Sequence, residues 1–137
     1  MIFTSDQFVE IAFLFEKENG NTLGEYENNV IDASTLKNIP VDQLEASIIE
    51  GLKKNAYIVE KTRISAYWAL SKRFNPDLIP HFKTWLQQEL DAEKNIAIFQ
   101  LMIALDRLNE PVFDATRTGV SFDEFDLNVK DAVKYLT

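Results

Sequence analysis

The sequence predicts an all-α fold, a single domain over residues 1–137 built as a stack of antiparallel helical hairpins with about seven helices. Two observations lead to this prediction. Apolar residues recur at helical spacing in one segment after another, and no segment alternates polar and apolar residues as a strand would. A short sequence motif also occurs twice, at 67–76 and again 35 residues later. Each copy has the pattern of an apolar helix that ends at a turn with proline.

The first three helices follow from capping residues and breakers. Thr4 and Gln7 can form a capping box, and Gly20 can end the helix that follows. A second helix is expected from Glu25 to about Leu36, and a third from Val41 to about Lys54. Each of the three helices has apolar residues at helical spacing. They are Phe8, Ile11, Ala12 and Phe15 on one face of the first, Tyr26, Val30 and Ala33 in the second, and Leu44, Ile48, Ile49 and Leu52 in the third, where they are expected to face inward.

A fourth helix is expected over roughly Tyr57 to Phe74. Asn75 can cap the next helix, with Pro76 at its first position. Pro80 follows closely and would lose one backbone hydrogen bond, so the regular helix is expected to begin a turn later. Its apolar stripe is Phe82, Trp85, Leu86 and Leu90.

The sixth helix should follow Asn95 as its cap, and it is apolar on most sides, which predicts the central and most buried helix. After a loop around Gly119, Ser121 and Glu124 can form another capping box. Phe125, Val129, Ala132, Val133 and Leu136 then have the spacing of a last helix.

The net charge of −8 is concentrated at one end of the chain. Residues 1–50 hold ten acidic and two basic residues, whereas residues 51–110 have a net charge of +2. An acidic field repels nucleic acid and anionic lipid and attracts basic proteins, so neither nucleic acid nor membrane is expected as a direct partner. The alternative is a solvated face that keeps the protein soluble.

The chain has few of the residue types that catalytic sites need. His81 is the only histidine and there is no cysteine, so neither a zinc site nor a cysteine nucleophile can be assembled. Asp123, Glu124 and Asp126 lack the spacing of a calcium loop and fit the first turn of a helix. We therefore expect no catalytic residues, no metal and no cofactor. The lack of cysteine, of a signal-like N-terminus and of a long apolar run predicts a cytoplasmic protein.

The segments 66–80 and 103–108 resemble HEAT-like helical repeats, in which an Ala-Leu pair packs between helices and a proline opens the next one. Ala69-Leu70 corresponds to Ala104-Leu105, and Pro76 to Pro111. The resemblance covers roughly residues 57–113 and implies a repeat pair. Trp68 departs from the small residue usual in these repeats.

The whole chain also resembles small bacterial immunity proteins of contact-dependent growth-inhibition and polymorphic-toxin systems, in its size, its acidity and its helical pattern. The resemblance implies a protein that binds one cognate toxin domain, a basic nuclease, and neutralises it by stoichiometric protein–protein inhibition. The alternatives are a helical-repeat adaptor for a non-toxin partner, and a small enzyme or accessory subunit. A partner is expected to contact Glu25, Tyr26 and Glu27, or else Asp123, Glu124 and Asp126.

Overall fold

Helix α1 (Ser5–Glu18) begins at the capping box that its sequence predicts. The Thr4 hydroxyl accepts a hydrogen bond from the Gln7 amide at 3.2 Å, and the Gln7 side chain accepts one from the Thr4 amide at 2.9 Å. These two bonds satisfy donors that would otherwise be unpaired at the start of the helix. Phe8, Ile11 and Phe15 then lie fully buried on one face, as expected.

The computed structural model describes all 137 residues and contains seven α-helices, one short 3₁₀ helix and no strand, which confirms the all-α prediction. The chain forms two compact units, unit 1 (Met1–Arg73) and unit 2 (Phe74–Thr137). The single-domain organisation stays a prediction. After α1, the elements are α2 (Glu25–Ala33), α3 (Val41–Lys53) and α4 (Glu60–Ser71) in unit 1, then η1 (Pro76–Leu78), α5 (Ile79–Asp91), α6 (Asn95–Asp106) and α7 (Phe125–Leu136) in unit 2.

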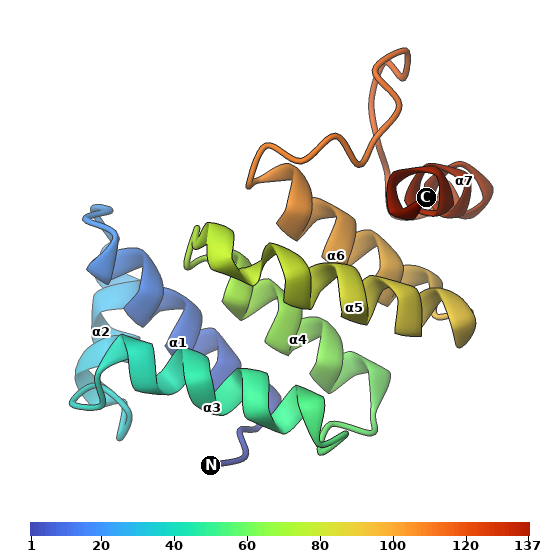
Figure 1. Ribbon diagram of the computed structural model, residues 1–137. Helices are drawn as coiled ribbons and strands as arrows, with labels where there is room; N and C mark the ends of the chain where they lie inside the picture. Colours follow the sequence, from blue (N-terminus) through green and yellow to red (C-terminus); the bar gives the residue numbers. More distant parts are fainter. The chain divides into compact units, whose positions relative to one another are not determined.

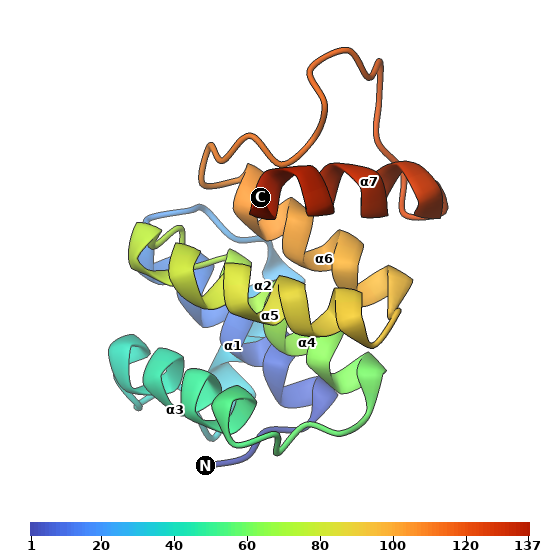
Figure 2. The same ribbon diagram turned by 45° about the vertical axis from the view of Figure 1, so that its right-hand side comes forward.

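Within unit 1, α1 contacts the other three helices and lies beside α4 (Figure 1). Within unit 2, α5 and α6 lie side by side, and α7 packs on both (Figure 2). Ala97, Leu101 and Met102 of α6 are fully buried, so this helix is the most apolar and most buried of its unit, as its composition predicts.

Helix α4 begins at Glu60, three residues later than expected, because Tyr57 is buried in the loop before the helix. The Tyr57 ring lies 2.7 Å from where a Cβ would stand on Gly51, and its hydroxyl accepts a hydrogen bond from the Phe3 amide at 3.1 Å. Arg63 donates to the carbonyls of Tyr57 and Ile58, which holds this loop at the start of the helix. Tyr57 therefore joins the N-terminal segment to the end of α3.

The turn around Pro76 forms as predicted. The Asn75 side chain accepts a hydrogen bond from the Asp77 amide at 3.0 Å, Pro76 opens η1, and the regular helix α5 begins at Ile79 with Pro80 in its first turn. Two other expected caps do not form. Asn95 is the first residue of α6 rather than its cap, and the Ser121 hydroxyl donates to the Asp123 carboxylate instead of capping α7.

The repeated motif encodes the end of a helix. Both Ala-Leu pairs are fully buried, and the corresponding residues Phe74 and Asn109 both adopt a left-handed backbone, with φ of 51° and 64°. The two copies then diverge. Pro76 opens a helix, whereas Pro111 leads into a long irregular segment that arches outward before α7 (Figures 1 and 2).

Five helices end with a left-handed residue just past the last turn. One of these residues is Phe74 after α4, and the other four ends share one hydrogen-bond pattern. The four residues are Gly20 after α1, Asn55 after α3, Glu93 after α5 and Asn109 after α6. At each of these four ends, the amide of the next residue bonds to a carbonyl five positions earlier, as from Lys94 to Glu89 at 3.0 Å. Gly and Asn tolerate this conformation, whereas for glutamate it is strained.

A buried arginine holds the irregular segment of unit 2. Arg117 donates to Asp131 at 2.8 Å, to Asn128 at 3.1 Å and to Glu124 at 3.1 Å, all in or next to α7. The side chains of Arg117 and Asp131 are only 9% and 7% exposed. The hydrogen bond to Asp131 raises the pKa of the Arg117 guanidinium, which stays charged. Charge-assisted hydrogen bonds thus fix the part of the segment around Arg117, while Val112 is buried nearer α6.

Stability should fall in alkaline solution because two tyrosines are held in their neutral form. Burial raises the pKa of Tyr135, and a 2.6 Å hydrogen bond to Glu110 raises it further, while burial also raises the pKa of Tyr57. Above about pH 10 the unfolded chain loses these protons first, so the free energy of unfolding should decrease as pH rises. Urea unfolding over this range measures the slope, and Tyr135→Phe should make it shallower; an unchanged slope would contradict this assignment.

Candidate protein-binding surface

Helix α2 turns the face that carries Tyr26 and Ala33 outward. Only Ile31 of this helix is buried, whereas Tyr26 is 69% exposed and Ala33 is exposed as well. The helical spacing of Tyr26, Val30 and Ala33 therefore marks an outer face of α2 rather than its buried one. Apolar residues lie on both sides of this short helix, and α1 packs against the side that carries Ile31.

The exposed face of α2 forms one wall of a groove of about 400 Å³, which we call the Tyr26 groove. It is lined by Asp6, Val9 and Glu10 of α1 and by Tyr26, Val30 and Ala33 of α2. The edge of the Tyr26 ring meets Phe13 with the ring centres 6.4 Å apart. Phe13 steadies the ring on one side while most of its surface stays open to a partner.

Carboxylates in and beside the Tyr26 groove lack internal counterions. Asp6, Glu10, Glu25 and Glu27 form no ion pair. Some other acids of unit 1 are paired with bases from residues 51–73: Glu16 pairs with Lys72 at 3.1 Å, and Asp42 with Arg73 at 2.7 Å. The excess negative charge of the N-terminal third is therefore left largely around α2 and the first turns of α1.

The two glutamates beside Tyr26 differ in position. An oxygen of Glu27 lies 2.8 Å from where a Cβ would stand on Gly24, so this half-buried side chain folds back over the start of its own helix. No side chain caps α2, and a carboxylate there favours the helix N-terminus. Glu25 is exposed and Tyr26 stands beside it, so these two are better placed for a partner than Glu27.

The second predicted set lies in unit 2, and its members have separate surroundings. Glu124 pairs with Arg117 at 3.1 Å, and Asp123 accepts a hydrogen bond from the Ser121 hydroxyl at 2.6 Å. Asp126 is exposed and forms no ion pair. Glu124 therefore contributes to holding the irregular segment, and only Asp123 and Asp126 remain for a partner.

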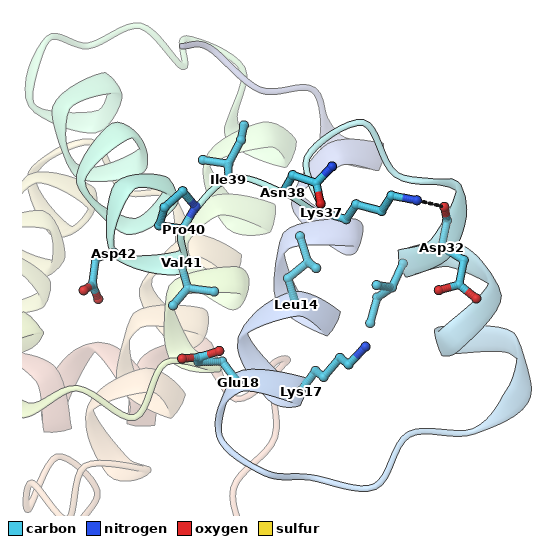
Figure 3. Close-up of a pocket in the computed structure, with 11 residues that line it drawn as sticks. Leu14, Lys17, Glu18, Asp32, Lys37, Asn38, Ile39, Pro40, Val41 and Asp42 are labelled. Atoms are coloured by element: carbon cyan, nitrogen blue, oxygen red, sulfur yellow. Dashed lines mark hydrogen bonds between the residues drawn. The ribbon is translucent and has the colours of Figure 1, made fainter.

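A larger hollow of about 700 Å³ also lies on unit 1, and the basic residues of the N-terminal third are found there rather than at the Tyr26 groove. Lys17 and Lys37, the only basic residues in the first 50, both line it, together with Glu18, Asp32 and Asp42 (Figure 3). The Lys37 ammonium donates to the Asp32 carbonyl at 2.8 Å, where it caps the end of α2. Both lysines thus lie on this hollow, and no base lines the Tyr26 groove.

The sequence carried a signal for the groove that we did not use. Asp6, Val9, Glu10 and Phe13 recur at helical spacing on α1, apart from the buried face of Phe8, Ile11 and Phe15. Two apolar residues among acids on the outer face of a helix are typical of a surface that contacts something else.

His81 and the carboxylates outside this groove are the other side chains that could form a site. His81 stacks on Trp85 with the ring centres 5.6 Å apart, and no three histidine or carboxylate side chains lie close enough to hold a metal ion. None of the helices has the length and apolar character needed to cross a membrane.

Comparison of the chain with protein-family models, with curated proteins and with solved structures gives no match.

Proposed function

We propose that this protein is an immunity protein that binds a cognate toxin domain, a basic nuclease, and neutralises it by forming a stoichiometric complex. The observation that supports the proposal is the Tyr26 groove, where an exposed aromatic ring lies among carboxylates that have no internal counterion. Such a surface favours a partner with lysine or arginine around an apolar or aromatic contact.

A nuclease offers this chemistry because its substrate is a polyanion. The site that holds phosphates must be basic, so a set of carboxylates can occupy the same field and compete with the nucleic acid. Tyr26 would supply the desolvated anchor that charge alone does not provide. Lys17 and Lys37 line the larger hollow and not the Tyr26 groove, so their positive charges do not weaken the attraction between the groove and a basic partner.

Co-expression with the toxin tests the function directly. The gene beside the one for this chain should encode a toxin whose expression arrests growth, and this chain should restore growth and purify with the toxin domain in a one-to-one complex. Protection without a complex would contradict direct inhibition. A stable complex with a partner that has no toxicity would instead favour the adaptor, the second function that a binding groove on a helical fold allows.

The association rate should depend strongly on salt if the carboxylates steer the encounter. We expect the rate constant to fall by about tenfold or more between low salt and about 0.5 M salt, while the dissociation rate changes little. Stopped-flow mixing at a series of salt concentrations measures both. The double variant Glu10→Gln and Glu25→Gln should flatten this dependence, and a rate that ignores salt would exclude electrostatic steering.

A further inference from the structure

Helix α7 leaves three of its apolar side chains exposed at the surface. The residues it buries are Asn128, Asp131 and Ala132, and the first two hold Arg117. Phe125, Leu127 and Val133 remain 40%, 45% and 48% exposed. The side of α7 that faces its own unit is thus largely occupied by a polar network, and much of the apolar area of these three side chains is left without a partner inside unit 2.

Phe125 stands at a groove of about 650 Å³ within unit 2, between the α5–α6 turn and the first turns of α7. We call it the Phe125 groove. Its apolar walls come from Leu90, Ile98, Phe125 and Val129. Two carboxylates, Glu93 and Asp126, lie on it with one cation, Lys130. Neither carboxylate forms an ion pair, so a net negative charge surrounds an apolar opening.

Glu93 is strained where it stands. Its φ is 56°, and of the four other left-handed residues that follow a helix, three are glycine or asparagine and the fourth is Phe74. Glycine or asparagine would adopt the left-handed backbone more readily than glutamate. A strained residue held at a groove suggests that its side chain serves a purpose other than stability.

We propose that the Phe125 groove is a second docking surface, which takes an amphipathic basic helix from a protein partner. An apolar side chain of that helix enters between Phe125 and Leu90, and its lysines or arginines face Glu93 and Asp126. Charge selects this occupant. Unit 2 holds eleven acidic and six basic residues, so a second copy of the chain or an anionic lipid surface would be repelled.

The test uses the full chain and a fluorescently labelled synthetic helix with leucine on one face and lysine on the other, followed by anisotropy. Phe125→Ala should weaken binding by about thirtyfold, as for a central apolar anchor. Glu93→Gly should weaken it by about threefold, as for a charge at the rim, yet raise the melting temperature because the strain is relieved. Loss of binding in a more stable protein cannot be blamed on misfolding.

Three controls make the outcome decisive. Asn109→Gly changes the matching helix end away from the groove, so it should leave binding unchanged, as should Tyr26→Ala in unit 1. A helix with glutamate in place of lysine should not bind. The proposal is overturned if the lysine helix does not bind, if the glutamate helix binds equally well, if Glu93→Gly binds like the parent, or if Tyr26→Ala abolishes binding while Phe125→Ala does not.

Discussion

Replacing Arg117 with alanine is expected to lower the free energy of unfolding by about 3–5 kcal/mol. The substitution leaves the Asp131 carboxylate, only 7% exposed, without its cation, and it removes the hydrogen bonds to Asn128 and Glu124. An uncompensated buried charge is far more costly than the loss of a surface pair. Urea unfolding measures the change, and hydrogen exchange should show it concentrated in residues 107–124 and α7.

The paired substitution separates the ion pair from simple loss of packing. Arg117→Ala with Asp131→Ala removes both charges, so the double variant should lose less stability than the sum of the two single variants. Lys94→Ala, at an exposed lysine just before α6, should change stability by less than about 1 kcal/mol. Strict additivity of the two charge-removing variants would show that the attraction between them contributes nothing.

Replacing Tyr26 with alanine is expected to raise the dissociation constant for the cognate partner by about thirtyfold or more, which corresponds to about 2 kcal/mol. The ring supplies the largest exposed apolar surface at the Tyr26 groove, and its removal leaves the surrounding carboxylates without an anchor to desolvate them. Calorimetric titration with the purified partner measures the effect. Because the ring packs against little but Phe13, the stability of the free protein should change little.

Two matched variants test whether the effect comes from the ring of Tyr26 at the groove. Tyr26→Phe keeps the ring and should keep most of the affinity. Ile58→Ala removes an equally prominent apolar side chain of unit 1, 85% exposed, from a place outside the groove, and it should have no effect. If the complex forms but Tyr26→Ala binds as tightly as the parent, the partner uses another surface, while the proposed inhibition of a toxin would still stand.

Local signals in the sequence predicted two of the four expected helix caps correctly. The capping box at Thr4 and the delayed helix after Pro76 depend on residues within a few positions of one another, so the chain itself specifies them. The outward face of α2 does not follow from such signals. Tyr26 and Ile31 are both apolar, and only the packing of α1 decides which of them is buried.

The polar network of unit 2 could not be foreseen either. Arg117 pairs with Asp131, which lies 14 residues away in the sequence. The residue type alone does not show whether an arginine or an aspartate will be buried. Glu45 is buried for a similar reason, with Arg73 reaching it from 28 residues away. Such pairs depend on where the helices come together, which is information that spacing alone does not contain.

The contact between Gly51 and the ring of Tyr57 has a consequence for evolution. Because the ring occupies the place of a Cβ at residue 51, any other amino acid there must push the tyrosine out and break its bond to the Phe3 amide. The two positions are therefore expected to vary together in related chains. A lineage that lost the glycine would have to carry a smaller side chain at 57 and find another way to fix its N-terminal segment.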